Sequence, residues 1–236
     1  ETLRQRVEHG IFGYTRVPDA YYEAVTGWFE RRHGWQIRKE WMICTSGVVP
    51  AISAVIKALT EPGDKVLVQT PVYNCFFSSI RNNRCEIIRT PLSYAHDTFT
   101  IDYEDLEKKA ADPKVKVMLL CNPHNPAGRV WTKEELLEVA KIAERHELYI
   151  ISDEIHADFV YGGKHHTPMA SVSDYAMEHT ITAFAPSKTF NVAGLCQSYV
   201  VIPNKKLYNA YDATYNAFDL GDNIFGMTAL TAAYTK

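Results

Sequence analysis

Residues 115–153 read VKVMLLCNPHNPAGRVWTKEELLEVAKIAERHELYIISD, and this stretch carries the clearest structural pattern in the chain. Val115–Cys121 and Leu148–Ser152 are continuous apolar runs of strand length. Between them, Thr132 and Glu135 have the spacing of a capping box, which predicts a helix that ends before the second run. Two continuously apolar strands joined by a helix indicate a parallel sheet that is covered on both faces.

The same alternation of strands and helices extends over most of the chain. Further strands are predicted at about 41–45, 65–70, 86–89, 180–184 and 197–202, and further helices over 19–33, 48–59, 73–82 and 103–110. The pattern predicts an α/β fold with three layers, αβα, around a mostly parallel sheet.

Composition excludes several classes of protein. The chain has 236 residues, of which 46% are hydrophobic and 22% charged, and its net charge is −3 without a basic block. Nucleic acid and anionic membrane are therefore not expected as partners. No apolar stretch approaches the roughly 20 residues of a membrane-spanning helix.

The cysteines and histidines favour a reduced, metal-free protein. The five cysteines are scattered and form no CxxC pair, and Cys44, Cys121 and Cys196 fall in apolar runs. We expect buried free thiols and a cytoplasmic location. The adjacent His165 and His166 match no zinc-helix spacing, so we expect them in a surface loop and predict no metal site.

Five residues of suitable chemistry each lie at or just beyond the carboxyl end of a predicted strand: Gly47, Tyr73, Asn125, Asp153 and Lys188. Ligands of open α/β sheets bind along that edge, because the carboxyl ends of parallel strands meet there. We therefore expect these residues to lie around one site.

An amine, a carboxylate and an amide are what a pyridoxal 5'-phosphate (PLP) site requires. Lys188 would form the Schiff base with the cofactor aldehyde, Asp153 would keep the pyridine nitrogen protonated, and Asn125 would hydrogen-bond the phenolic oxygen. Taken singly, a lysine past a strand is usually a surface residue, and the aspartate and asparagine are usual in helix caps and turns. The combination favours the cofactor.

Other residues complete the predicted site. The backbone N–H groups of Gly47 and Val48, at the start of a predicted helix, would hold the phosphate together with the Ser187 hydroxyl. Tyr73 would stack on the pyridine ring, although an aromatic residue there can also be core. His156 either shares the phenolic oxygen with Asn125 or is an ordinary helix-face histidine.

Several motifs resemble fold type I PLP enzymes of the aminotransferase class I/II superfamily, and more closely the MalY/PatB group of cystathionine β-lyases, or C–S lyases. The resemblance extends from about residue 11 to about residue 203. It is carried by Phe12–Thr15, Gly47–Ser53, Thr70–Tyr73, Cys121–Thr132, Ser152–His156 and Ser187–Asn191.

The resemblance implies a sheet of seven strands and a homodimer with active sites at its interface. Residues 1–15 would be an N-terminal segment that reaches this interface, where Tyr14 is offered to the neighbouring subunit's cofactor. Residues 16–236 would be the PLP-binding large domain, and the C-terminal small domain, with the arginine for the substrate carboxylate, would be missing. This chain departs from related aminotransferases at two positions. Ala185 stands where they often have a phosphate-binding serine, and Cys196 stands where many have a phosphate-binding arginine.

The implied activity is α,β-elimination on cystathionine or a related cysteine S-conjugate, which gives a thiol, pyruvate and ammonia. Lys188 and Tyr14 are its catalytic candidates. A PLP-dependent aminotransferase, which shares the early steps, is the first alternative. A regulatory or binding protein on a PLP-enzyme fold is the second.

Overall fold

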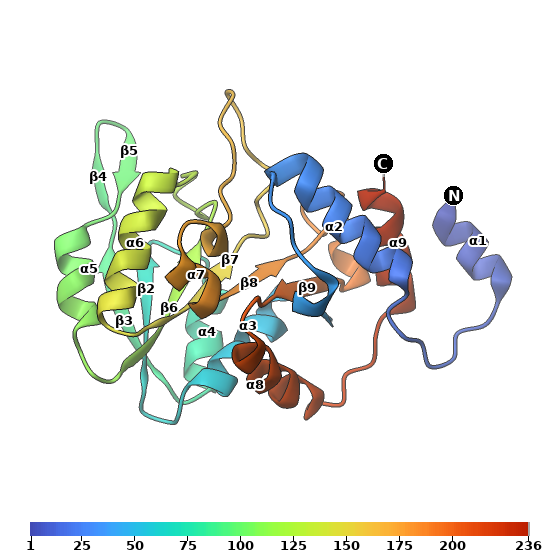
Figure 1. Cartoon of the computed structure of the whole chain (residues 1–236), viewed down its shortest axis with the longest axis horizontal. Helices are drawn as coiled ribbons and strands as arrows, with labels where there is room; N and C mark the ends of the chain where they lie inside the picture. Colours follow the sequence, from blue (N-terminus) through green and yellow to red (C-terminus); the bar gives the residue numbers. More distant parts are fainter. Residues whose placement is uncertain (236) are drawn as a thin grey trace.

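Within residues 1–235, which the computed structural model describes, seven strands form one twisted sheet in the order β1-β9-β8-β7-β6-β2-β3 (Figure 1). The strands are β1 (Met42–Thr45), β2 (Lys65–Thr70), β3 (Glu86–Pro91), β6 (Val115–Cys121), β7 (Tyr149–Asp153), β8 (Thr180–Phe184) and β9 (Ser198–Val201). All neighbouring pairs are parallel except those of β9, which is antiparallel to both β1 and β8. The predicted sheet of seven mostly parallel strands is thus confirmed.

Helices cover both faces of the sheet. One face carries α3 (Val48–Leu59), α4 (Cys75–Asn82) and α8 (Lys205–Asn216), and the other carries α5 (Tyr103–Ala110), α6 (Lys133–Arg145), α7 (Asp174–His179), α2 (Asp19–His33) and α9 (Ile224–Tyr234). Along β2, Val66 and Val68 pack toward α3 whereas Leu67 packs toward α6, as the two-residue period of a strand requires. The three-layer prediction is therefore confirmed.

Local sequence signals set many of the element bounds. Thr132 and Glu135 form the predicted capping box, in which each side chain accepts the other residue's backbone N–H. The Asp102 side chain accepts the Asp105 N–H and caps α5. Three strands and three helices (β2, β6, β8, α2, α3 and α5) have the predicted bounds.

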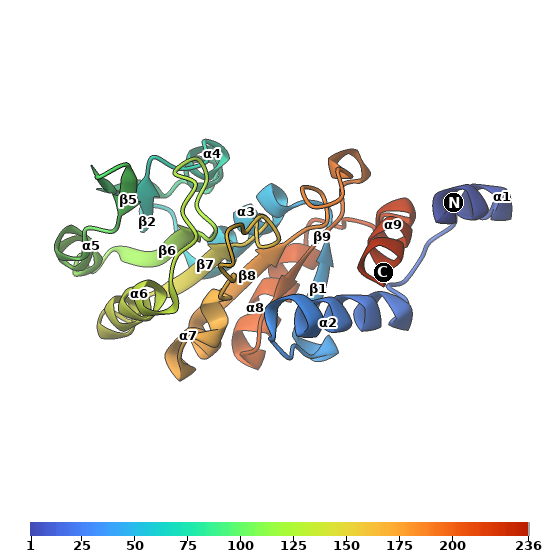
Figure 2. The same cartoon turned by 90° about the horizontal axis from the view of Figure 1, so that it is seen from above.

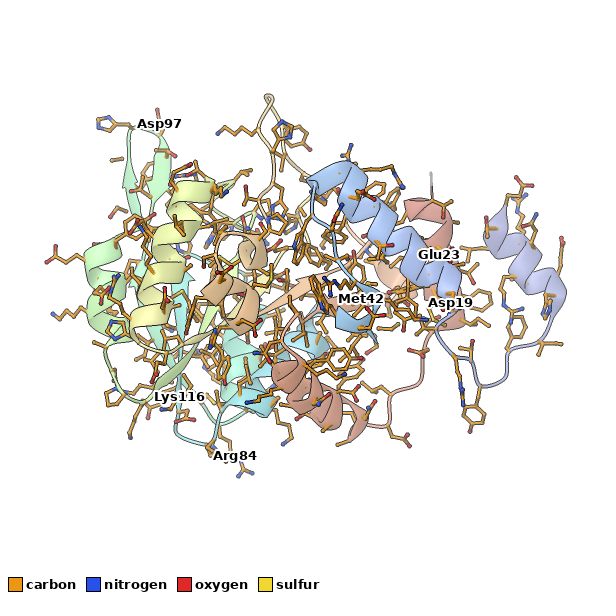
Figure 3. The ribbon with its side chains drawn as sticks, in the orientation of Figure 1. Asp19, Glu23, Met42, Arg84, Asp97 and Lys116 are labelled. Carbon is orange, nitrogen blue, oxygen red and sulfur yellow. The ribbon has the colours of Figure 1, made fainter. Side chains whose placement is uncertain are left out.

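Several elements were not predicted. α1 (Thr2–His9) has no buried residue and stands at one end of the molecule beside α9 (Figure 2). β4 (Ser93–Ala95) and β5 (Thr98–Thr100) form a small hairpin, whose turn at Asp97 projects from the molecule (Figure 3). Neither α1 nor the β4–β5 hairpin has a row of apolar residues facing the core, so hydrophobic periodicity did not indicate them. None of the helices in the described residues has the length and apolarity needed to cross a membrane.

Candidate active site

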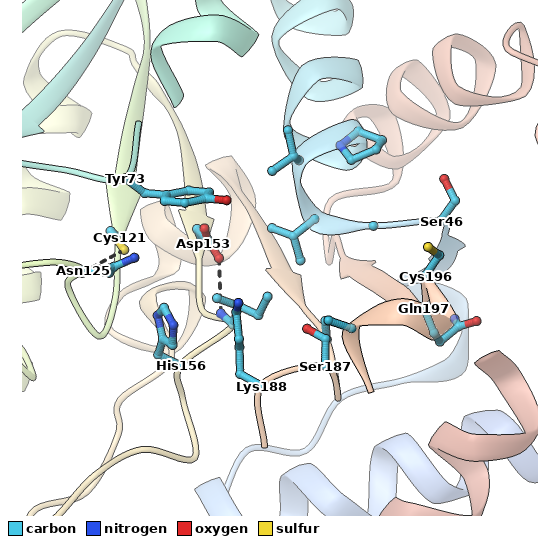
Figure 4. A pocket seen from close by; sticks show the side chains of 17 residues that line it. Ser46, Tyr73, Cys121, Asn125, Asp153, His156, Ser187, Lys188, Cys196 and Gln197 are labelled. Atoms are coloured by element: carbon cyan, nitrogen blue, oxygen red, sulfur yellow. Dashed lines mark hydrogen bonds between the residues drawn. The ribbon is translucent and has the colours of Figure 1, made fainter. Parts of the chain in front are cut away.

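A cavity of about 270 Å³ opens where β1, β6, β7 and β8 end (Figure 4). It brings together all eight residues that the sequence proposed as cofactor contacts, from five segments of the chain: Gly47, Val48, Tyr73, Asn125, Asp153, His156, Ser187 and Lys188. The parallel strands explain the convergence, because their carboxyl ends share one edge of the sheet. Cys121, Ile155, Ala193 and Gln197 are among the other lining residues.

Asp153 is the last residue of β7 and lines the cavity. Its side chain is buried, and Oδ1 accepts the Ile155 N–H at 3.2 Å. Burial raises the pKa of this carboxyl to about 7, against the smaller opposing effects of the Ile155 N–H and Lys188. The ionised form of a buried carboxyl is stabilised by a cationic partner, and a protonated ring nitrogen is such a partner.

Lys188 lies in the turn that follows β8, and its side chain points toward Asp153 (Figure 4). The turn is closed by two backbone hydrogen bonds, from Phe190 N to the Pro186 carbonyl at 2.9 Å and from Val192 N to the Ser187 carbonyl at 3.0 Å. The Lys188 side chain remains exposed to the cavity. An amine in this position is free to react with an aldehyde that enters the site.

The opposite end of the cavity has the donors that an anion needs. Gly47 and Val48 form the beginning of α3, where the first backbone N–H groups of a helix have no partner within the helix. The preceding N–H, of Ser46, is instead donated to the Tyr215 hydroxyl at 2.9 Å. Ser187 lines the same cavity and adds a hydroxyl.

Three more side chains line the part of the cavity between Asp153 and the loop after β6. The Asn125 backbone N–H donates to Cys121 Sγ at 3.3 Å, which fixes the residue at the cavity wall (Figure 4). Burial, and to a smaller extent the Lys188 charge, lower the pKa of His156, so its imidazole is favoured in the neutral form. Tyr73 presents a flat ring above Asp153 (Figure 4). An amide, a neutral imidazole and an aromatic ring suit an oxygen-bearing aromatic cofactor.

Tyr14 does not contact this cavity in its own chain. Its side chain is fully exposed, in the segment that joins α1 to α2. The expected contribution to a neighbouring subunit's site stays a prediction.

Gln197 is a cavity residue that the sequence did not indicate. It directly precedes β9, which runs against its neighbours and therefore brings its amino end to the edge where the other strands end. Its buried amide donates to the Tyr21 hydroxyl at 3.0 Å and so joins the cavity wall to α2. Strand direction is not encoded in an apolar run, so no sequence signal placed this residue.

Two expectations about cysteine and histidine were wrong. Cys196 is exposed rather than buried, because it follows the turn at 193–195 and precedes the strand. His166 is buried rather than in a surface loop, and its Nε2 lies 2.6 Å from Glu154 Oε2. Only His165 of the pair is exposed. Among residues 1–235, no group of three or more His, Cys, Asp and Glu side chains is placed to hold a metal ion.

Comparison with known proteins extends these observations. Residues 3–234 match the family model "Aminotransferase class I and II". The chain is 44% identical over its whole length to the cystathionine beta-lyase PatB of Bacillus subtilis and 35% identical to the protein MalY of Escherichia coli, and it spans 61% and 60% of their lengths. A PLP-bound putative aminotransferase from Clostridium difficile has the same fold over the whole chain, with a TM-score of 0.96 and 46% identity, and the chain covers 61% of it.

Proposed function

The chain belongs to the aminotransferase class I and II family, and from this we propose that it is the cofactor-binding part of a PLP-dependent C–S lyase. The observation that carries the proposal is the meeting of Lys188, Asp153 and Asn125 around one cavity. The identity of 44% to a cystathionine β-lyase supports the lyase reaction. The substrate would be cystathionine or a related cysteine S-conjugate.

The chemistry of the residues fits PLP. When bound, the cofactor supplies an electron-withdrawing ring that makes the α C–H bond of an amino acid acidic. Asp153 would accept a hydrogen bond from the protonated ring nitrogen, and its charge would hold that proton in place. Gly47, Val48 and Ser187 would donate hydrogen bonds to the phosphate.

The remaining contacts would orient the ring. Asn125 and His156 would share its phenolic oxygen, and Tyr73 would cover one face. Lys188 would hold the aldehyde covalently until a substrate amine replaces it. Its freed amine would then act as the base that elimination requires and remove the substrate α-proton.

In the elimination, the bond between the substrate β-carbon and sulfur breaks, and the electron pair leaves with the thiolate. The remaining three-carbon fragment is hydrolysed to pyruvate and ammonia. An aminotransferase would use the same residues for the first proton transfer. The similarity to a structure described as a putative aminotransferase favours this as the second candidate function.

The assay that separates the two supplies L-cystathionine to the full-length protein and measures pyruvate and free thiol. The lyase predicts both products without any acceptor. A keto acid formed only when an amino-group acceptor is added would overturn the lyase proposal.

The covalent role of Lys188 is tested independently of turnover. Borohydride reduction with PLP should attach the cofactor to the peptide that contains Lys188, as read by mass spectrometry. Lys188→Ala should abolish the label, and Lys164→Ala, at an exposed lysine in a nearby loop, should retain it. A label that survives in Lys188→Ala contradicts the site assignment.

We further propose that residues 16–236 act as the PLP-binding large domain of a cytoplasmic homodimer, with residues 1–15 at the interface. The absence of buried residues in α1 and the full exposure of Tyr14 support an intersubunit role for this segment. Co-expression of Tyr14→Phe and Lys188→Ala subunits tests it. Each variant alone should be impaired, and mixed dimers should regain activity, because one of their two sites then has both native residues.

A further inference from the structure

A set of buried and half-buried polar side chains lies outside the cavity lining and has no part in the proposed chemistry. It begins at Thr189, the residue that follows Lys188. Thr189 Oγ1 donates to Asp158 Oδ2 at 2.8 Å. The other carboxylate oxygen of Asp158 lies 3.4 Å from His33 Nε2 at the end of α2, and the Asp158 and His33 side chains are 8% and 5% exposed.

The second half of the set begins at Glu154, the residue that follows Asp153. Glu154 Oε2 lies 2.6 Å from His166 Nε2, and both side chains are fully buried. The other oxygen accepts hydrogen bonds from Ser152 Oγ and from Met169 N, each at 2.8 Å. These three partners of the carboxylate are all protein groups, and Glu154 does not line the cavity.

The two halves meet at two imidazole rings. The His33 and His166 rings pack edge to face, with centroids 5.3 Å apart and an interplanar angle of 82°. A continuous series of contacts therefore runs from the neighbour of Lys188, through α2, to the neighbour of Asp153. The two residues proposed to hold opposite parts of the cofactor are 35 positions apart in the chain, but this series ties them together.

Asp158 is favoured in its ionised form within this arrangement. Burial acts to raise the pKa of its carboxyl, but the interactions with His33 and Thr189, and the Arg32 guanidinium 3.8 Å away, lower the pKa overall. The hydrogen bond from Thr189 therefore has a charged acceptor, which makes it stronger than one between neutral groups. A charge buried to this extent is costly unless such partners are present.

We propose that Thr189 and Asp158 are positioning residues, whose hydrogen bond holds the turn of Lys188 at a fixed place relative to Asp153. The inference rests on the proposed role of Lys188 as the covalent anchor. A bond that served only overall stability would change the global unfolding of the protein. A positioning bond changes the local opening of residues 186–192.

Hydrogen exchange in the cofactor-free, full-length protein distinguishes these roles. Thr189→Val removes the hydroxyl at nearly constant volume, and Thr189→Ser keeps it. Thr60→Val is the matched control, because Thr60 Oγ1 also donates a hydrogen bond, to the Ile56 carbonyl, at the end of α3 opposite to the residues that line the cavity. The amides of Phe190 and Val192 report on the turn, and the amides of β7 report on global unfolding.

We expect Thr189→Val to exchange the two turn amides about tenfold faster, as for the loss of one hydrogen bond to a charged acceptor, with β7 unchanged. Thr189→Ser should stay within about twofold of the native protein, and Thr60→Val should leave the turn amides unaltered. Equal turn exchange in Thr189→Val and native protein would overturn the proposal. If Thr189→Val does not fold, Thr189→Ala removes the same hydroxyl without the branched side chain and is judged by the same criterion.

A second measurement keeps the two proposals separate. The rate of borohydride-stable attachment of PLP should fall in Thr189→Val and recover in Thr189→Ser. Native protein that takes no label at Lys188 would refute the cofactor proposal, while the exchange result would still decide whether the Thr189–Asp158 bond holds the turn.

Discussion

Replacement of Asp153 by asparagine should have opposite effects on folding and on cofactor binding. In the cofactor-free protein the Asp153 carboxyl is 4% exposed, and burial raises its pKa from 3.8 to about 7. When the pKa of a carboxyl is higher in the folded than in the unfolded protein, its contribution to stability is complete only at a pH below the unfolded-state pKa. Its contribution is lost as pH rises toward and through the folded value. Ionised Asp153 therefore destabilises the empty protein near neutral pH.

The size of the effect follows from the two pKa values. At about 1.4 kcal/mol for each tenfold change in proton affinity, the interval between 3.8 and about 7 corresponds to about 4 kcal/mol. The asparagine side chain carries no such charge, so the advantage of Asp153→Asn in free energy of unfolding should grow by about 3–4 kcal/mol between pH 4 and pH 8. Any constant cost of burying the amide cancels in this difference.

Urea unfolding of the cofactor-free protein between pH 4 and pH 8 measures the gap. Asp97→Asn makes the same chemical change at the exposed hairpin turn and should show no pH-dependent advantage (Figure 3). The same Asp153→Asn variant should bind PLP about 10- to 100-fold more weakly, because a hydrogen bond to a charged partner is lost. A stability gap that does not change with pH would refute the reasoning about burial, and undiminished cofactor affinity would refute the assigned role.

Two further substitutions test the packing around the site. Glu154→Ala should lower the free energy of unfolding by about 3–5 kcal/mol in urea titrations, because it leaves His166 buried without its carboxylate; a loss below about 1 kcal/mol would mean that the pair is hydrated. Gly226→Ala should cost about 1–3 kcal/mol, since the added methyl group would lie 2.7 Å from the Leu195 carbonyl oxygen. Gly194→Ala, where the methyl group meets no atom within 4 Å, is its control in thermal unfolding; equal melting temperatures for the two variants would contradict the packing argument.

The local pattern predicted much of the sheet and of the site. Some signals involve only a few neighbouring residues and can therefore be read from the sequence alone. Examples are the apolar runs at 115–121 and 180–184 and the capping box at Thr132. The position of a polar residue after such a run also suffices to place Lys188 and Asp153 at one edge, provided that the strands are parallel.

The remaining features depend on contacts between distant segments. α9 is apolar nearly all round, so its helical period gave no indication of which face packs on α2. The burial of His166 depends on Glu154 and on His33 from α2, and neither relation follows from the composition of the loop.

Hydrophobic periodicity and residue chemistry are local properties, so the amino-acid sequence alone predicts an α/β chain with an amine, a carboxylate and an amide at the ends of its strands. The opposite direction of β9, the resulting entry of Gln197 into the cavity wall, and the contacts of Asp158 with Thr189 and His33 depend instead on how the layers pack. These contacts join residues whose proximity arises from the packing of layers, and a linear pattern carries no record of which layer each segment will face.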